Sequence, residues 1–476
     1  MLNRRDSLKL GAVAGAAMLV PAGRLSAVFA DDEGTASTPF TRALPIPPVL
    51  RPVSSTADHD LYDMTLAPTT ASILPGLQTP LLTFNGSFPG PTIRARRGRA
   101  SKVRVTNRMT TPSSVHLHGA DVAPSSDGHP VDLIQPGESK IYHYPNRQPA
   151  ATLWYHDHAH HIEAEQVYRG LAGLYLIGDA ESDALGLPGG QYDIPLFIRD
   201  AAFDEQGRLL FTLDDFASRR VVLVNGAHQP FVQVRRRKYR LRLVNAANSR
   251  PIRLVLSDGG EFVRIASDGG LLEHPVRGTS IELWPAERAE VVVDFTNHAT
   301  GSTLYLENVF NGPETPNRQL LQFQVGEPVP DPSRVPDTLR THPDLGEPIL
   351  TRTINMGRDA TNTFYAINGL PYDPDRIDFR CKRGSTELWV VNNTDGQYNF
   401  PHSMHVHLVQ FRVLDRNGVP VGPEEAYPKD TVRIPAGQTV RMLVRFESPF
   451  TGVYPYHCHF LDHSSAHMMA QLEVVP

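Results

Sequence analysis

The chain has 476 residues, enough for about three domains of ordinary size. Pro and Gly are both frequent (41 and 36 residues), which argues against a helical bundle, and 20% charged residues of mixed sign argue against a disordered or coiled-coil chain. The formal net charge of −5 excludes a generally basic nucleic-acid binder, and two Cys residues cannot form a disulfide framework, whereas twenty His residues require an explanation.

Residues 1–30 have the composition of a targeting segment. Two arginines at residues 4–5 precede an apolar stretch at 10–20 that is too short to span a bilayer, and Ala-Val-Phe-Ala at 27–30 resembles a cleavage site. The arginines are typical of a twin-arginine signal, with Ser7 where Phe is usual, and an ordinary secretory signal is the alternative. We therefore expect an exported protein, periplasmic or extracellular, and no other stretch is predicted to cross a membrane.

One pattern recurs three times along the chain. An Asn-Gly pair is followed by a Pro and an alternating apolar run that ends on Asn, and later by a Pro-Gly or Pro-Ala turn and a short apolar strand. The Asn-Gly pairs stand at 85–86, 225–226 and 368–369, and the turns at 136–137, 285–286 and 435–436. The sequence therefore predicts three consecutive copies of one domain.

These repeats predict three all-β domains. Short runs rich in Val, Tyr and Phe between Gly, Pro and Asn-Gly turns are typical of antiparallel strands in a sandwich or barrel. We expect domains at residues 45–180, 190–328 and 345–476, with linkers near 180–192 and 327–348. The Arg and Lys residues of the run 232–244 are predicted to form a solvated face, with anion binding as the alternative.

Half of the His residues are concentrated in four short segments, two in the first repeat and two in the third. These residues are His116, His118, His156, His158, His402, His405, His407, His457, His459 and His463. The second repeat lacks them, since Leu254 stands where the spacing of the first repeat puts a His. Successive side chains of a strand point to opposite faces, so each of the four His-x-His pairs turns both imidazoles to one side. This arrangement predicts a metal site, and imidazole alone suits Cu, Zn, Fe or Ni.

Cys458 separates the last His-x-His pair and is therefore predicted to point to the opposite side, into a second pocket. A His precedes the third pair, and His463 and Met468 follow Cys458. Two His, one Cys and a weakly held Met form the ligand set of a blue-copper site. Met469 is the alternative to Met468, and a disulfide with Cys381 is the alternative use of Cys458. Otherwise we expect Cys381 to be an inert, buried thiol on a strand.

With these motifs the chain resembles the three-domain multicopper oxidases, specifically the bacterial spore-coat-type laccases and bilirubin-oxidase-like members. The resemblance covers residues 45–476 and is carried by His116-Leu-His-Gly, Trp154-Tyr-His-Asp-His, His402-x-x-His-x-His and His457-Cys-His-x-x-x-His-x-x-x-x-Met. It implies three consecutive cupredoxin-like Greek-key β-sandwich domains, the second free of metal, and four copper ions per chain: one type 1, one type 2 and two type 3.

The resemblance also implies which copper each ligand holds. The type 1 copper is expected on His402, Cys458 and His463, with Met468 axial. The type 2 copper is expected on His116 and His405. The type 3 pair is expected on His118, His156, His158, His407, His457 and His459. The main chain of Cys458 would then join the electron-accepting copper to the cluster that reduces O₂.

Two acidic residues are candidates for proton handling, and two positions depart from the family pattern. Asp127 stands where similar oxidases keep an acid near the trinuclear cluster, and a turn residue is the alternative. Ser464 replaces the Glu that bacterial laccases usually carry after His463, and either Asp462 compensates or it is only a surface acid. Ser403 replaces a usual Pro and is expected to loosen the backbone around the type 1 site.

The expected reaction is the one-electron oxidation of phenols or aromatic amines coupled to the four-electron reduction of O₂ to water. The alternatives are a metallo-oxidase acting on Cu(I), Fe(II) or Mn(II), and a non-catalytic exported copper-binding scaffold. We expect a monomer whose partners are a small reductant and O₂, with no nucleic acid. Four further residues, His129, His160, His161 and His467, are expected to be ordinary surface His or to lie behind the ligands, and His129 to line a channel.

Overall fold

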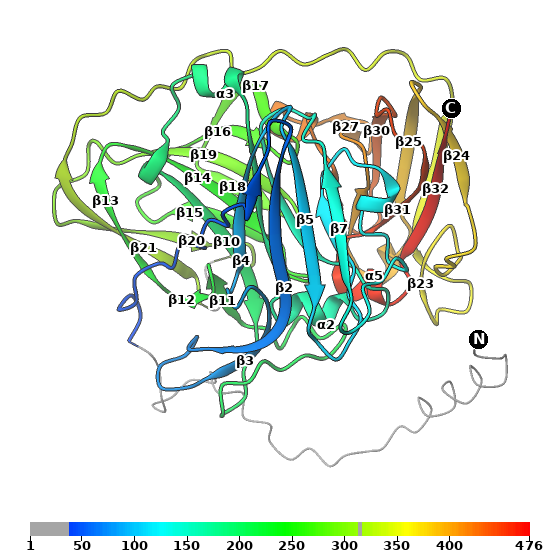
Figure 1. Ribbon diagram of the computed structural model, residues 1–476. Helices are drawn as coiled ribbons and strands as arrows, with labels where there is room; N and C mark the ends of the chain where they lie inside the picture. Colours follow the sequence, from blue (N-terminus) through cyan, green and yellow to red (C-terminus); the bar gives the residue numbers. More distant parts are fainter. Residues whose placement is uncertain (1–37, 313–316) are drawn as a thin grey trace.

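The computed structural model describes residues 38–312 and 317–476, so the predicted targeting segment at 1–30 lies outside the described residues. Nearly all regular structure in the described ranges is β-strand, arranged in six sheets (Figure 1). The prediction of an all-β chain is therefore confirmed. No helix among the described residues is long and apolar enough to cross a membrane.

The first two sheets pack face to face in the N-terminal part of the chain. One sheet has the order β1-β2-β5-β7 with β3 beside β2, and the other has the order β4-β9-β8-β6. Their strands are β1 (Ser54–Ser55), β2 (His59–Ala71), β3 (Thr79–Phe84), β4 (Gly90–Arg96), β5 (Ala100–Asn107), β6 (Val115–His118), β7 (Ser139–Tyr144), β8 (Ala151–Asp157) and β9 (Ala172–Gly178). Buried residues such as Val105, Leu117 and Tyr142 fill the space between them.

The second pair of sheets follows in sequence. The orders are β12-β11-β10-β14-β19-β16-β17 and β13-β21-β20-β15-β18. The strands are β10 (Asp193–Ala201), β11 (Val221–Val224), β12 (Ala227–His228), β13 (Phe231–Arg236), β14 (Lys238–Asn245), β15 (Ile252–Leu256), β16 (Phe262–Ser267), β17 (Gly270–Gly278), β18 (Ser280–Leu283), β19 (Arg288–Asp294), β20 (Thr303–Asn308) and β21 (Gln319–Pro328). Leu241, Leu254 and Phe323 belong to their common core, so Leu254 occupies the interior where the first repeat carries a His.

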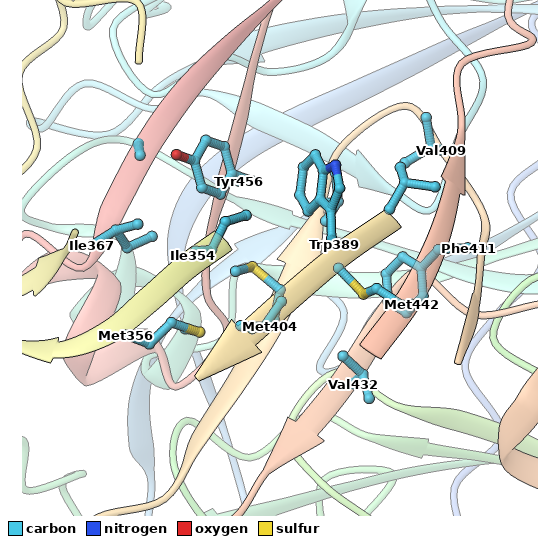
Figure 2. Packing of buried hydrophobic residues seen from close by; sticks show 14 of the residues in the cluster. Ile354, Met356, Ile367, Trp389, Met404, Val409, Phe411, Val432, Met442 and Tyr456 are labelled. Atoms are coloured by element: carbon cyan, nitrogen blue, oxygen red, sulfur yellow. The ribbon is translucent and has the colours of Figure 1, made fainter. Parts of the chain in front are cut away.

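The third pair of sheets forms the C-terminal part of the chain. The orders are β23-β22-β25-β30-β27-β28 and β24-β32-β31-β26-β29. The strands are β22 (Thr351–Arg358), β23 (Tyr365–Ile367), β24 (Phe379–Lys382), β25 (Thr386–Asn393), β26 (His402–Val406), β27 (Phe411–Arg416), β28 (Val419–Pro420), β29 (Thr431–Ile434), β30 (Thr439–Arg445), β31 (Gly452–Cys458) and β32 (Met469–Val475). Trp389, Met404, Met442 and Tyr456 point into the core between the two sheets (Figure 2).

The three sheet pairs repeat the same strand pairings. One sheet of each pair contains a parallel contact near its N-terminal strand: β2 with β5, β10 with β14, and β22 with β25. The opposite sheet of each contains a second parallel contact: β4 with β9, β13 with β21, and β24 with β32. The repeat seen in the sequence is thus a repeat of topology. We propose that the domains extend over the predicted residues 45–180, 190–328 and 345–476, since the strands of each pair lie within these ranges.

Helices within residues 38–312 and 317–476 are few and short. They are α2 (Glu163–Tyr168), α3 (Ala180–Ala184), α4 (Pro423–Ala426) and α5 (Leu461–Ser465), with 3₁₀ turns η1 (Pro124–Ser126), η2 (Gly190–Tyr192) and η3 (Gly396–Tyr398). Helices α2 and α5 come from opposite ends of the chain and lie against each other, and the main-chain N–H of Ala164 donates to Ser465 Oγ at 3.1 Å. In Figure 1 the first (blue to cyan) and third (yellow to red) sheet pairs lie side by side, with α2 and α5 near their lower ends.

The basic run at residues 232–244 is not one strand with a solvated face, as predicted from its alternation. It is split at Arg237 into β13 and β14, and Arg242 on β14 is only 7% exposed. Its guanidinium pairs with Asp193 at 2.7 Å and with Glu290 at 2.8 Å, both on neighbouring strands. Sequence alternation misled here because these buried arginines are neutralised by carboxylates far away in the sequence.

Candidate metal centres

Cys458 and two His residues form a compact group in the third sheet pair. His402 begins β26, Cys458 ends β31, and His463 lies on α5. The two Nδ1 atoms are 3.2 Å apart, and Cys458 Sγ lies 3.5 Å from His463 Nδ1 and 3.8 Å from His402 Nδ1. Donors held tetrahedrally by one first-row ion at ordinary bond lengths stand ~3.3 Å (N to N) and ~3.5 Å (S to N) apart. The group therefore has the dimensions of a metal site.

Neighbouring groups hold these donors in place. His402 Nε2 lies 3.1 Å from Asp395 Oδ2, which leaves Nδ1 directed at the thiol. The His463 ring stacks on Tyr365 with centroids 4.1 Å apart. The main-chain N–H of Ser403 donates to Cys458 Sγ at 3.5 Å, so the residue expected to loosen the backbone instead contacts the sulfur.

The protonation chemistry of the group also fits a metal. Burial lowers the pKa of His402, and lowers that of His463 further, so both imidazoles are neutral with free lone pairs at neutral pH. Burial raises the pKa of the Cys458 thiol to about 12, and a bound cation is the kind of charge that removes such a proton. Cys458 and Cys381 are both free and buried, so the structure contains no disulfide between them, and Cys381 lies on β24 as predicted.

Eight further imidazoles converge in a cage between the first and third sheet pairs. Nε2 of His405 lies 3.4 Å from Nε2 of His116, and Nε2 of His457 lies 3.2 Å from Nε2 of both His158 and His407. The cage also contains His118, His156 and His459, and all eight side chains are at most 1% exposed. The sequence pairs predicted this convergence, because Met404 and Tyr456 turn into the core of Figure 2 while His405 and His457 face the other way.

Seven of the eight rings have one nitrogen occupied by a protein acceptor, which leaves the other nitrogen for the cage. Nδ1 of His116, His156, His405 and His457 contacts a main-chain carbonyl at 2.6–2.9 Å. Nδ1 of His407 contacts the carboxylate of Asp127, and Nδ1 of His158 contacts that of Glu163. In His118 it is Nε2 that contacts a carboxylate, that of Asp430. Nδ1 of His118, Nε2 of His156 and both nitrogens of His459 are buried with no partner. Buried, unpartnered imidazole nitrogens that face one another fit bound metal ions.

Asp127 lies at the wall of the cage and is 1% exposed. His407 Nδ1 donates to Asp127 Oδ2 at 2.7 Å, and Asp127 Oδ1 lies 3.6 Å from His116 Nδ1. Burial raises the pKa of Asp127 to about 7. A buried acid that contacts two rings of the cage is more than a turn residue, which was the alternative.

Asp462 is neither a surface acid nor a neighbour of the cage. It is fully buried, and its carboxylate accepts two hydrogen bonds from Arg219 at 2.7 and 2.9 Å and one from Ser249 at 2.5 Å. Because Arg219 and Ser249 belong to the second sheet pair, Asp462 holds α5 against that part of the chain. Its carboxylate is committed to this contact, so it does not supply the acid missing at Ser464.

An apolar cavity of about 210 Å³ opens beside the edge of His463. Aromatic side chains form much of its wall: Phe216, Trp284, Phe310, Phe400 and Phe460. Besides His463, four polar residues also line it: Ser249, Arg250, Asn308 and Asn311. A flat aromatic molecule has the shape and polarity to fill this cavity.

Comparison with known proteins identifies the family of this arrangement. Two family models, both described as multicopper oxidase, match residues 65–182 and 342–476. The laccase of Bacillus subtilis (strain 168) is 33% identical over 91% of this chain and 98% of its own length. The chain is a multicopper oxidase. The bilirubin oxidase of Albifimbria verrucaria is also similar, with 38% identity over 90% of this chain and 80% of its own length. Together with the laccase, this relative shows that the oxidase is of laccase type.

Solved structures agree with this assignment. A laccase from Pediococcus acidilactici Pa5930 matches this oxidase with a TM-score of 0.84 and 31% identity, over 92% of this chain and 96% of the other. The predicted cupredoxin-like fold is therefore confirmed, and the oxidase is a copper enzyme that uses oxygen. The assignment of each ligand to one copper ion is still a prediction.

Sequence reasoning missed Glu163, the first residue of α2 in the oxidase. Glu163 is fully buried, its Oε2 lies 2.9 Å from His158 Nδ1, and Ser464 Oγ donates to its other oxygen. Burial alone would raise the pKa of Glu163, but the neighbouring His158 lowers it to about 2. Burial alone would lower the pKa of His158, but Glu163 raises it. A carboxylate thus lies beside Ser464, although it comes from the first sheet pair rather than from position 464.

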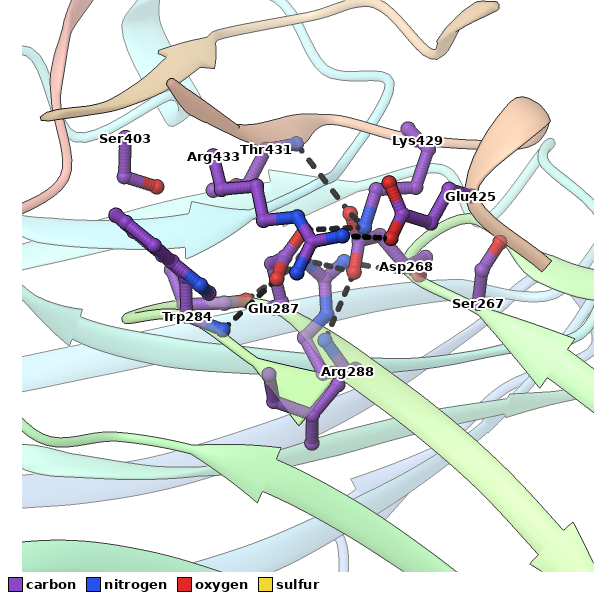
Figure 3. Close-up of polar contacts among 12 residues, drawn as sticks. Ser267, Asp268, Trp284, Glu287, Arg288, Ser403, Glu425, Lys429, Thr431 and Arg433 are labelled. Carbon is purple, nitrogen blue, oxygen red and sulfur yellow. Dashed lines mark hydrogen bonds and ion pairs between the residues drawn. The ribbon is translucent and has the colours of Figure 1, made fainter. Parts of the chain in front are cut away.

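The middle part of the oxidase is connected to the cage through Asp430. Arg288 on β19 is fully buried and forms two contacts of 2.6 Å with Asp430. Asp430 Oδ1 lies 3.0 Å from His118 Nε2, and its main-chain carbonyl lies 2.8 Å from His405 Nδ1. Figure 3 shows Arg288 within a wider set of ion pairs, in which Lys429 bridges Asp268 and Glu287 at 2.8 Å each. The two contacts of Asp430 fix the tautomers of His118 and His405.

Proposed function

We propose that this multicopper oxidase takes single electrons from small phenolic or aromatic amine compounds and uses them to reduce O₂ to water. The observation that carries the proposal is the set of buried imidazole nitrogens directed at one another, next to a separate Cys-His-His group. About four copper ions per chain fit these donors. His402, Cys458 and His463 would hold the type 1 copper, with Met468 as a fourth, weakly held ligand. The proposed type 2 ligands are His116 and His405, and the type 3 ligands are His118, His156, His158, His407, His457 and His459.

The apolar cavity beside His463 is the proposed reductant site. Stacking and burial against Trp284, Phe310 and Phe460 favour an aromatic ring over a hydrated metal ion. The amide of Asn311 is available to a hydroxyl or amino group of the substrate. A ring in this cavity lies against the edge of His463, which is the outermost of the three donors.

Bound copper supplies the one-electron acceptor at the first group and the oxygen-reducing centre in the cage. The protein's own residues supply the connection and the protons. Cys458 is covalently joined to His457 and His459, one residue on each side, which is the shortest route between the two groups. Asp127 and Glu163 contact rings on two sides of the cage. Asp127, with a pKa of about 7, can exchange a proton near neutral pH, whereas the ionised Glu163 carboxylate stabilises a proton on His158 Nδ1.

We further propose that residues 1–30 form a twin-arginine-type signal and that the mature enzyme works as a monomer in the periplasm or outside the cell. Export in the folded state suits a protein that must acquire copper in a cage closed by two distant parts of its chain. Cys458 and Cys381 form no disulfide, which fits this proposal because Cys458 is the proposed copper ligand.

Copper content and O₂ uptake test the function. We expect the copper-loaded enzyme to contain about four copper ions per chain, to show an intense blue absorption, and to consume O₂ when given a phenol. Metal analysis, absorption spectroscopy and an oxygen electrode measure these three properties, with the apoprotein as control. Uptake with Fe(II), Mn(II) or Cu(I) but not with a phenol would indicate a metallo-oxidase. A colourless protein, or one inert with every reductant, would contradict the proposal and favour the scaffold.

Replacing Asp127 with Asn tests the proton role of that residue. The amide still accepts a hydrogen bond from His407 Nδ1 but cannot take up or release a proton. Because its pKa is about 7, Asp127 is protonated below neutral pH and ionised above it, so the wild-type turnover profile should show a transition near pH 7. We expect Asp127→Asn to remove this transition and to lower kcat by about tenfold.

Asp132→Asn is the matched control, because Asp132 lies in the same loop, is largely exposed and pairs with Lys140. Its turnover profile should equal that of the wild type across the pH range. An Asp127→Asn profile with the wild-type transition intact would show that Asp127 only shapes the loop.

A further inference from the structure

Three His residues that lie outside both proposed copper centres meet at the surface. His160 and His161 follow β8, and His467 stands between α5 and β32. Their sequence positions gave no reason to expect a contact, and each was expected to be an ordinary surface residue or to lie behind the ligands. In the structure, one ring nitrogen of each lies within 4.8 Å of one ring nitrogen of the other two.

The three rings are arranged around a common point. The ring centroids of His160 and His161 are 3.8 Å apart, and the centroid of His467 lies 4.9 Å from His161 and 5.7 Å from His160. His161 is exposed, whereas His160 and His467 are half-buried. Nδ1 of His160 and Nδ1 of His467 are both buried atoms with no hydrogen-bond partner. Such atoms are uncommon in proteins and point to a missing ligand.

The backbone supports the same conclusion. His161 and His467 have φ angles of +70° and +80°, a left-handed conformation that is uncommon for residues other than Gly, although Asn, Asp and His adopt it more often than the rest. Strain of this kind persists where the surrounding structure enforces it, and it concentrates at binding sites. Here it turns two imidazoles from different parts of the chain toward each other.

We propose that His160, His161 and His467 bind one divalent first-row transition-metal ion, such as Zn²⁺ or Cu²⁺, in addition to the copper centres. Three imidazoles with an exposed side leave a fourth position open to water, which is an arrangement that both ions accept. The ion would join the segment after β8 in the first sheet pair to the segment before β32 in the third. It would therefore cross-link the two parts of the chain that build the cage.

Zn²⁺ binding to the copper-loaded enzyme tests the site. We expect equilibrium dialysis with metal analysis to find one Zn²⁺ per chain, with the copper content and the blue absorption unchanged. Loss of a group behind a metal ligand already weakens binding by ~10–100-fold, so loss of a ligand itself in His161→Asn should weaken Zn²⁺ binding at least about tenfold. Asn tolerates the left-handed conformation of residue 161, and the side chain is exposed, so the fold should be unaffected.

His467→Asn is the second variant and His143→Asn the matched control, because His143 is an exposed His on β7 outside the cluster. The control should bind Zn²⁺ as the wild type does. A second readout is thermal unfolding, since a ligand that binds only the native state raises the unfolding temperature, and His161→Asn should lose this rise.

Two results would overturn the proposal: no saturable Zn²⁺ binding by the wild type, or equal binding by the wild type, His161→Asn and His467→Asn. Copper content and colour are measured on the same samples. Failure of this site is therefore distinct from failure of the proposed oxidase function.

Discussion

Cys458→Ser is expected to abolish both the intense blue absorption and O₂ consumption. The blue absorption requires a thiolate ligand, and Cys458 is the sulfur donor that contacts both His402 and His463. A serine hydroxyl is nearly isosteric, so the eight imidazoles of the cage keep their positions and the protein keeps its fold. We therefore expect a colourless protein that still binds copper in the cage. Absorption spectroscopy, metal analysis and an oxygen electrode measure these outcomes.

Cys381→Ala is the matched control for this substitution. Cys381 is the second cysteine, equally buried, and it lies in the core of the third sheet pair far along the chain from the donors. Colour and turnover should be retained in this variant. If Cys458→Ser kept its turnover, electrons would have to reach the cage by a route other than the Cys458 main chain.

Glu163→Gln is expected to lower turnover by ~10–100-fold. The Glu163 carboxylate lies 2.9 Å from His158 Nδ1, a pairing that keeps Nε2 of that ring toward the cage. The amide of Gln has only one acceptor oxygen and no charge, so it holds the His158 tautomer less firmly and does not stabilise a proton on Nδ1 as the carboxylate does. Steady-state turnover at saturating phenol, together with copper content, separates loss of metal from loss of rate.

Two further variants decide how Glu163 acts. Glu165→Gln is the control, because Glu165 lies on the same helix but is half-exposed and pairs only with Arg169. The double variant Glu163→Gln with Ser464→Glu restores a carboxylate from the other side of the same contact and should recover part of the lost turnover. A Glu163→Gln enzyme within about twofold of the wild type would contradict the assigned role.

The features that the sequence predicted depend on local spacing. The period of two along a strand was enough to group His116 with His118 and His457 with His459, and to turn Cys458 away from them. A comparison of the repeats showed that Leu254 stands in place of a His in the middle repeat, and the structure places it in the core. These predictions needed no knowledge of how the three repeats pack together.

The features that were missed or mistaken depend on packing between the repeats. Ser464 reaches Glu163 only because α5 meets α2, and Asp430 contacts His118 only because the first and third sheet pairs lie against each other. Arg242 was predicted to be solvated because its carboxylate partners lie on other strands. Asp462 likewise contacts residues of the second sheet pair, and His467 contacts His residues that follow a strand of the first.

The Ser403 amide has a consequence for how strongly the oxidase attracts electrons. Proline, the residue usual at this position, has no N–H, whereas Ser403 donates one to Cys458 Sγ. A hydrogen bond to the sulfur stabilises its negative charge, and that charge is greatest when the attached metal is reduced. With copper bound as proposed at His402, Cys458 and His463, this hydrogen bond would shift the reduction potential of the site upward. The site would then oxidise a wider range of donors and leave less driving force for the transfer to oxygen.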